Sequence, residues 1–136
     1  MAYQTPYFVI DENQLTKDFQ MLKSSLETSW GNYRIGYSFK TNSLPWLVTF
    51  LKAGGVMAEV VSDDEHSLAG ALGFSDPEIV SNGQVKKRPS FERVLLAGGI
   101  LNMDGRRELD WMEELAAAST AQTLRVGVRV NFDLEK

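Results

Sequence analysis

The chain has 136 residues, of which 43% are hydrophobic, and this suits one globular unit with an apolar core but not two ordinary domains. Its 14 Lys and Arg residues against 18 Asp and Glu residues give a net charge of −4, so nothing in the composition indicates electrostatic binding to nucleic acid. No cysteine is present, so disulfides, thiolate catalysis and zinc-finger sites are excluded, and no metal site is expected.

The amino terminus has none of the features of a targeting segment. Residues 1–13 lack a basic stretch followed by a long apolar one, and no apolar run approaches the roughly 18 residues that a membrane span needs. The sequence therefore predicts a cytoplasmic protein with small-molecule substrates and with no membrane or nucleic-acid partner.

The first predicted elements are a strand over residues 6–10 and an amphipathic helix after it. Asp11 and Gln14 fit a helix N-cap followed by the third helical residue. Apolar residues then recur at helical spacing, at Leu15, Phe19, Leu22, Leu26 and Trp30. This pattern predicts a helix with one buried face.

Five further strands are predicted, over residues 35–40, 57–62, 78–82, 100–104 and 125–131. Their ends follow one another at intervals of roughly 20 to 27 residues, a rhythm typical of βα units with right-handed crossovers. Helix signals occupy the intervals: Ser43 with Pro45, the capping-box pair Ser62 and Glu65, and the stop residues Gly54, Gly73 and Gly98. The fold class is therefore α/β, with about five parallel strands alternating with helices in part of a TIM-like (β/α)8 barrel.

Polar residues lie at or near the carboxyl ends of these strands, where a βα barrel keeps its active site. They are Lys40, Glu59, Asn82, Asp104, Arg129 and Asn131. In the last strand, three valines at positions 126, 128 and 130 share one face and are expected to pack on helices, while Gly127, Arg129 and Asn131 face the barrel interior. Helix capping explains Ser62, Glu65 and Asp104 as well as a ligand role does, so both interpretations stay open for these three residues.

Lys40 ends a strand whose side chains alternate between an aromatic face and a face of small residues. Tyr37 and Phe39 lie on the first face, and Gly36 and Ser38 share the second with Lys40. If it is buried among apolar and cationic neighbours, such an amine has a lowered pKa and can form a Schiff base with an aldehyde. The alternative is a solvated lysine at a strand end, the usual state of this residue type.

The basic run 86–88 and the single histidine are interpreted as parts of the scaffold and not of the site. The basic run 86–88 is interpreted as a solvated loop, given the acidic balance of the chain. His66, the single histidine, follows Glu65 inside a predicted helix and is interpreted as an ordinary helix residue.

Five blocks of the chain, taken in order, resemble the fold-type III pyridoxal-phosphate enzymes, specifically the ornithine, diaminopimelate and arginine decarboxylases. Residues 37–42 resemble the family's Tyr-Ala-x-Lys-Ala-Asn motif. The later blocks are Gly55 with residues 59–65, residues 79–86 with Asn82, Gly83 and Lys86, the set Asn102, Asp104 and Glu108, and residues 128–131. Glu59 stands where an aspartate is commoner, and Met57 replaces a glycine of the family pattern.

The resemblance implies that Lys40 is the catalytic residue, which holds pyridoxal 5'-phosphate as an internal aldimine, with Glu59 and Arg129 lining the cofactor pocket. Further pocket residues would be Asn42, Ser62, Glu65, Asn82, Asp104 and Asn131. The implied reaction is decarboxylation of a small amino-acid substrate. The alternative is a non-catalytic relative, either a carrier of pyridoxal phosphate or a decarboxylase-like regulatory binding protein.

The resemblance also implies a longer parent enzyme. Residues 12–136 would form the N-terminal part of the cofactor-binding barrel, and residues 1–11 would be a strand of a second β-domain. A closed barrel needs eight strands, so five leave two open edges, which proteins normally pair or cover. We therefore expect a homodimer or higher self-association, and no turnover by the 136-residue chain alone.

Overall fold

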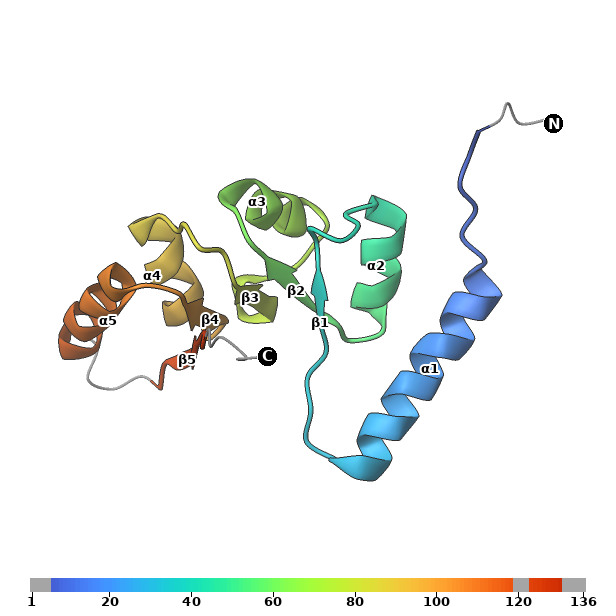
Figure 1. The fold of residues 1–136 in the computed structure, drawn as a ribbon, viewed down its shortest axis with the longest axis horizontal. Coiled ribbons are helices and arrows are strands. Elements are labelled where there is room, and N and C mark those ends of the chain that lie inside the picture. The colour runs from blue at the N-terminus through green and yellow to red at the C-terminus, as the bar shows by residue number, and fades with distance from the viewer. Residues whose placement is uncertain (1–5, 119–122, 131–136) are drawn as a thin grey trace, which may run out of the picture. The chain divides into compact units, whose positions relative to one another are not determined.

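Strands and helices alternate along the part of the chain that the structure describes, residues 6–118 and 123–130 of a computed structural model (Figure 1). The chain divides into two units, residues 1–34 and residues 35–136.

The first unit contains helix α1, Glu12–Ser29. Its N-cap is Asp11, whose Oδ1 accepts a hydrogen bond from the Gln14 backbone N–H over 3.0 Å, as the sequence predicts. Residues 6–10 form no strand, and the side chains of Phe8 and Val9 are exposed. A strand needs a bonded neighbour, and no described segment pairs with these residues. The strand expected there is therefore not formed in this structure, and the assignment of residues 1–11 to another domain stays a prediction.

The second unit is a parallel sheet in the order β1-β2-β3-β4-β5, which confirms the predicted α/β class with five parallel strands. The strands are β1 Gly36–Ser38, β2 Met57–Val60, β3 Ile79–Ser81, β4 Ile100–Met103 and β5 Arg125–Val128. The helices are α2 Pro45–Ala53, α3 Asp63–Ala71, α4 Arg88–Leu96 and α5 Arg106–Ala118, with a 3-10 turn η1 at Asp76–Glu78.

Each strand ends before the sequence predicts, because the polar residues at its carboxyl end already belong to the following loop. Single ladder bonds continue past three strand ends: Phe39 N–H donates to the Glu59 carbonyl, Asn82 N–H to Val60, and Arg129 N–H to Met103, over 3.0, 2.8 and 2.9 Å. These bonds hold the first loop residues in line with the sheet. They therefore fix the backbone from which the polar side chains of the site project.

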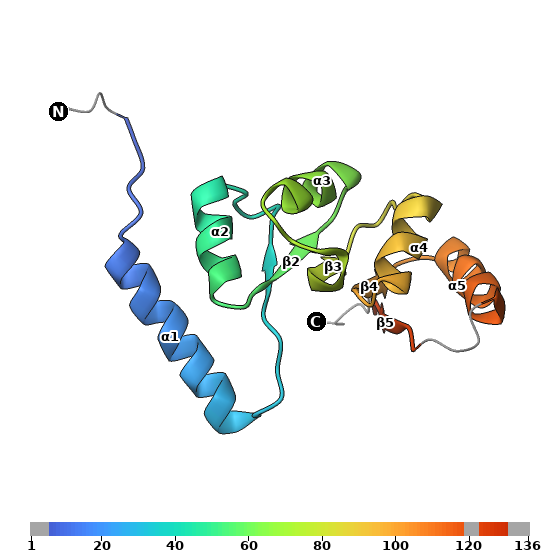
Figure 2. The ribbon, with the colours of Figure 1, turned by 180° about the vertical axis from the view of Figure 1, so that it is seen from behind.

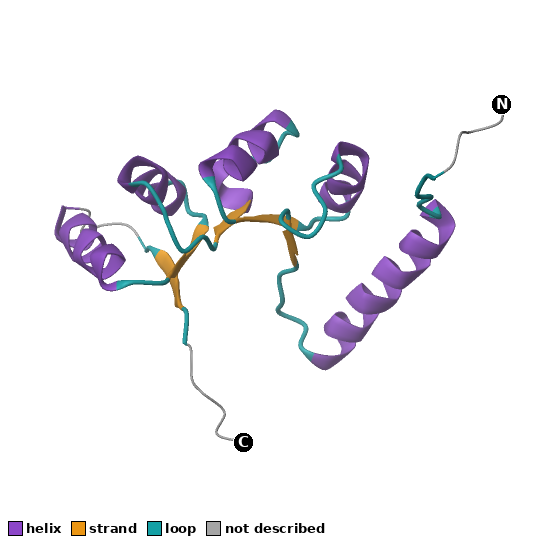
Figure 3. Cartoon of the chain, turned by 45° about the horizontal axis from the view of Figure 1, so that its top comes forward, coloured by secondary structure: helices purple, strands orange, loops and turns teal. Residues whose placement is uncertain are grey.

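The four helices of this unit lie along one face of the curved sheet, as the purple helices and orange strands of Figure 3 show. The apolar core fills the space between them. Its first cluster is Phe39, Val48, Ala58, Val60, Ala69, Phe74, Ile79 and Val94, and its second is Phe91, Leu95, Leu101, Met103 and Leu115. Helices α4 and α5 lie side by side in both opposite views, and Arg88 of α4 pairs with Glu114 of α5 at 2.7 Å (Figure 2). No described helix of this unit covers the other face of the sheet.

The valines of β5 depart from the prediction. Val126 shares a face with Leu101 of the core, yet Val126 and Val128 are 42% and 68% exposed. Helix α5 precedes β5, and no described helix follows it to cover this side. The expectation that these valines pack on helices is therefore wrong within the described residues.

Candidate active site at the carboxyl edge of the sheet

A cavity of about 850 Å³ opens at the carboxyl ends of the five strands. Parallel strands deliver their terminal residues to one edge, so residues far apart in sequence meet there. The lining residues are Lys40, Val61, Ser62, Asn82, Gly83, Gln84, Val85, Asn102, Gly127, Val128 and Arg129. Four of the predicted site residues, Lys40, Ser62, Asn82 and Arg129, thus share one cavity.

Lys40 projects from the turn that follows β1. Buried Phe39 anchors this turn in the core, and the Thr41 N–H closes it by donating to the Ser38 carbonyl over 3.1 Å. The Lys40 side chain is exposed, and its ammonium has no hydrogen bond or ion pair with any described residue. Of the two states considered for this amine, the structure shows the exposed one, because the described strands leave the interior face of the sheet open. The amine is free to meet a ligand in the cavity.

A chain of side-chain hydrogen bonds crosses three strands beneath the cavity. Asn82 Nδ2 donates to Glu59 Oε1 over 2.9 Å, and Asn102 Nδ2 donates to Asn82 Oδ1 over 3.1 Å. Glu59 does not line the cavity. Its hydrogen bond with Asn82 provides the partner that a charged residue within a sheet needs. This polar relay of Glu59, Asn82 and Asn102 fixes the floor of the site.

Gly127 of β5 packs against Asn102, the last residue of the relay. A Cβ at this position would lie 2.1 Å from Asn102 Oδ1, so the strand register brings the asparagine amide directly over the glycine. Asn102 was visible in the sequence only as part of a motif and was not among the predicted site residues. The signal that identifies it is the parallel register, which places Asn102 opposite Gly127 on the interior face.

Arg129 and Asp104 form an ion pair at the edge of the cavity. Arg129 Nη1 lies 3.2 Å from Asp104 Oδ1, and the two side chains are 41% and 20% exposed. An ion pair this exposed contributes at most about 1 kcal/mol to stability. Helix α5 begins at Arg106, and the described contact of the Asp104 carboxylate is with Arg129 rather than with the helix.

The remaining predicted residues serve local structure. Ser62 Oγ accepts from the Glu65 N–H over 3.2 Å, and Glu65 Oε2 accepts from the Val61 N–H over 2.8 Å, so both residues cap α3. Asn42 Oδ1 accepts from the Leu44 N–H over 3.0 Å in the turn before α2. Ser62 also lines the cavity, whereas Glu65 and Asn42 do not. Asn131 lies outside the described residues.

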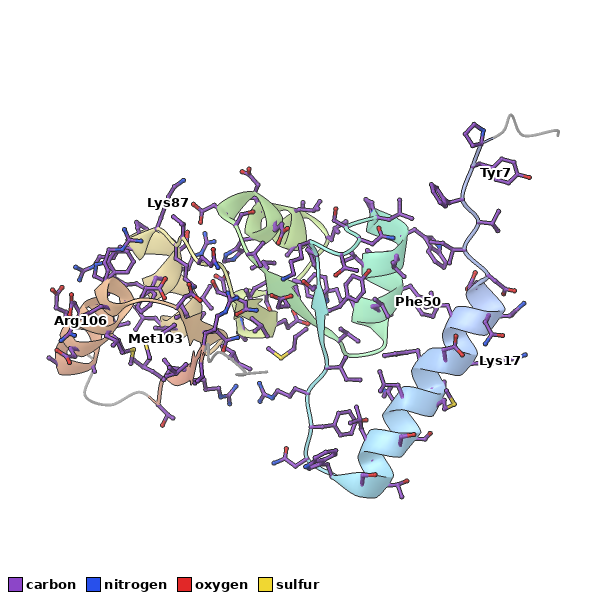
Figure 4. The ribbon with its side chains drawn as sticks, viewed as in Figure 1. Tyr7, Lys17, Phe50, Lys87, Met103 and Arg106 are labelled. Carbon is purple, nitrogen blue, oxygen red and sulfur yellow. The ribbon has the colours of Figure 1, made fainter. Side chains whose placement is uncertain are left out.

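The basic run after β3 separates into two environments, which corrects the expectation of a solvated loop. Lys86 is buried, with its ammonium between the two carboxylate oxygens of Glu108. Lys87, labelled in Figure 4, is exposed and lies 2.9 Å from Asp63 Oδ2. Sequence alone did not separate these neighbours, because the partner of Lys86 is contributed by α5, 22 residues away.

His66 lies in α3 and does not line the main cavity. It is buried, with Nε2 2.8 Å from Asp76 Oδ1 and 3.0 Å from Arg93 Nη2. These contacts tie α3 to η1 and α4. Nowhere in residues 6–118 and 123–130 do three His, Asp or Glu side chains gather closely enough to hold a metal ion. No helix in these same ranges is long and apolar enough to cross a membrane.

Asp63 supplies a pH-dependent contact between α3 and α4. Hydrogen bonds from Lys87 and Ser90 lower the pKa of its carboxyl group, so folding favours the ionised form. The stabilisation is present above the unfolded-state pKa and is lost as pH falls through the lowered folded-state pKa. We expect Asp63→Asn to flatten the acid-side loss of stability, measured by urea unfolding over a pH series. An Asp64→Asn variant serves as the matched control, and identical acid slopes for wild type and Asp63→Asn would contradict the prediction.

Comparisons with known proteins identify the family. Residues 12–136 match the family model described as "Pyridoxal-dependent decarboxylase, pyridoxal binding domain". The L-glutamyl-[BtrI acyl-carrier protein] decarboxylase of Niallia circulans is 30% identical over 133 residues, which cover 96% of this chain and 30% of that protein. The diaminopimelate decarboxylase of Methanothermobacter thermautotrophicus is 26% identical over 129 residues, 95% of this chain and 29% of its own. The chain thus spans less than a third of the length of both curated relatives.

Solved structures agree with this assignment. Diaminopimelate decarboxylase from Helicobacter pylori, complexed with L-lysine, matches with a TM-score of 0.72 and 26% identity over 95% of this chain and 32% of that one. The diaminopimelate decarboxylase of M. jannaschi matches with a TM-score of 0.69 and 26% identity over 88% of this chain and 29% of that one. Together with the parallel sheet and the cavity at its carboxyl edge, these matches show that the chain belongs to the pyridoxal-dependent decarboxylase family, in which it corresponds to the pyridoxal-binding domain.

Proposed function

We propose that this chain is the N-terminal, cofactor-binding portion of a pyridoxal-phosphate-dependent amino-acid decarboxylase of the diaminopimelate type, with Lys40 as the catalytic residue that bonds to the cofactor. The observation that carries the proposal is the Lys40 amine in a cavity at the carboxyl edge of the sheet, without a described partner. The names of the relatives support the reaction class.

The residues of the cavity fit this cofactor. Pyridoxal phosphate is a flat, anionic aldehyde, and it needs an amine to bond its carbonyl carbon and polar groups to hold its ring and charge. The amine of Lys40, the guanidinium of Arg129 and the amides of Asn82 and Asn102 all line one cavity of about 850 Å³. A space of this size is within the range of small-molecule sites, roughly 300 to 1,000 Å³.

Each of these groups has a proposed role. When bound, pyridoxal phosphate supplies the electron-accepting ring that stabilises the α-carbon as the substrate carboxylate leaves as carbon dioxide. Lys40 would hold the cofactor, because its amine can bond the carbonyl carbon of the cofactor's aldehyde. Arg129, oriented by Asp104, places a fixed positive charge at the cavity edge, and the relay of Glu59, Asn82 and Asn102 keeps the floor rigid.

Decarboxylation by the full-length protein tests the proposal. We expect carbon dioxide release, dependent on added pyridoxal phosphate, from at least one of meso-diaminopimelate, L-lysine, L-ornithine and L-arginine. Cofactor binding without release from any of them would contradict the catalytic proposal and favour a non-catalytic carrier or regulator. The 136-residue chain alone is expected to be inactive, and measurable turnover by it would contradict its place as one part of the enzyme.

We also propose that the chain associates with itself. Among the described residues, β1 and β5 each pair on one side only, and such edges normally find a partner. Light scattering across a concentration series is expected to give a mass of at least two chains. A monomer at the highest concentration would contradict this proposal.

A further inference from the structure

A buried ion pair lies just outside the cavity, and the proposed reaction does not use it. Lys86 Nζ lies 3.1 and 3.2 Å from the two carboxylate oxygens of Glu108. The side chains are only 4% and 2% exposed, and neither lines the cavity. Lys86 comes from the loop after β3, and Glu108 from the first turn of α5.

Stability alone is a poor explanation for this ion pair. Moving two charges out of water costs about as much as their attraction returns, and an apolar pair of similar volume is often at least as stable. Removing one partner is different, because it leaves a buried charge without compensation. The other contacts of the two side chains therefore indicate what the pair holds in place.

Both side chains also bind backbone groups at strand ends. Lys86 Nζ donates to the Gly83 carbonyl oxygen, and Glu108 Oε2 accepts from the Asp104 N–H over 2.7 Å. One ion pair therefore clamps the loop after β3 to the loop after β4. We call Lys86 and Glu108 the loop clamp.

The two clamped loops carry polar groups of the cavity. Gly83 follows Asn82 directly, and Asn82 lines the cavity and bonds Glu59 and Asn102. Asp104 holds Arg129 through the contact of 3.2 Å. A shift of either loop would therefore move a group that faces the ligand.

We propose that Lys86 and Glu108 are positioning residues for the cofactor site, holding Asn82 and, through Asp104, Arg129 in the geometry that binds pyridoxal phosphate. The inference rests on the proposed function, because it assumes that the cavity receives this cofactor. The two residues of the loop clamp contact the loops after β3 and β4 and do not line the cavity that would receive the cofactor.

The test separates positioning from stability in the full-length protein. Lys86→Met and Glu108→Gln each remove one charge, and the double variant Lys86→Met/Glu108→Leu replaces the pair by apolar groups. The single variants are expected to unfold at lower urea concentration, and the double variant to recover much of that loss. The control variant is Glu92→Gln, which removes one carboxylate of an exposed 2.7 Å pair in α4 and leaves Arg88 paired with Glu114 of α5.

The decisive readouts are the affinity for pyridoxal phosphate and the circular-dichroism band of the bound cofactor. In the double variant we expect affinity to fall by at least roughly tenfold and the band to change, since small misplacements in a site have large effects. Glu108→Gln keeps a side-chain oxygen that can accept from the Asp104 N–H, so it should lose less cofactor affinity than the double variant. Wild-type affinity and band in the double variant would overturn the positioning role. Failure of the wild-type protein itself to bind pyridoxal phosphate would instead overturn the proposed function.

Discussion

Replacing Lys40 by alanine in the full-length protein is expected to abolish covalent retention of pyridoxal phosphate and to lower decarboxylation by roughly a thousandfold or more, the scale on which removal of one catalytic group acts. The reason is that, among the described residues, no other lysine lines the cavity and could bond the aldehyde of the cofactor. Retention is measured by borohydride treatment followed by mass spectrometry, and turnover by carbon dioxide release.

Two further variants sharpen this prediction. Lys40→Arg keeps the positive charge, but its guanidinium stays protonated and cannot bond the aldehyde, so it should fail as Lys40→Ala does. Lys52→Ala removes a lysine of α2 that pairs with Glu78 of η1, and this variant should retain cofactor and activity. Substantial activity in Lys40→Arg would show that the charge of this residue matters and its nucleophilic nitrogen does not.

Changing Gly83 to alanine is expected to cost about 1 to 3 kcal/mol of unfolding free energy or more and to weaken cofactor binding. A Cβ on Gly83 would lie 2.2 Å from the Val61 carbonyl oxygen and 2.9 Å from its carbon, both backbone atoms that cannot rotate away. The loops after β2 and β3 would have to separate, and Asn82 would move with them. Urea unfolding and cofactor titration measure the two effects.

Gly70 offers the matched control for that substitution. It lies inside α3, and a Cβ there would meet nothing within 4 Å. Gly70→Ala should therefore stabilise the protein by about 0.5 to 1 kcal/mol, the usual gain for this exchange in a helix, and leave cofactor binding unchanged. Equal stability of Gly83→Ala and Gly70→Ala would contradict the close approach of the two loops.

The architecture could be predicted from the sequence because its signals are local. Alternation in each apolar run defined the two faces of the strands, and cap residues such as Asp11 and Ser62 marked where helices begin. The parallel order then followed from the regular strand-helix rhythm. The strand proposed for residues 6–10 did not form, because a strand depends on a neighbour that its own sequence does not contain.

The site was predictable only in part, because its connections run between distant segments. The strand-end position of Lys40 and Arg129 was visible from the sequence. The bond from Asn102 to Asn82, by contrast, requires the register of β3 and β4, and the burial of Lys86 requires the position of α5. The interpretation of the basic run 86–88 as a solvated loop was therefore wrong for Lys86, which is buried, although Lys87 is exposed.

The most direct test of the account is borohydride reduction of the full-length protein with pyridoxal phosphate, followed by peptide mapping. We predict that the reduced pyridoxyl group appears on Lys40 in stoichiometric amount and on other lysines only at background level. Labelling spread over exposed lysines such as Lys87, or concentrated on a lysine other than Lys40, would contradict the proposal that this cavity holds the cofactor through Lys40.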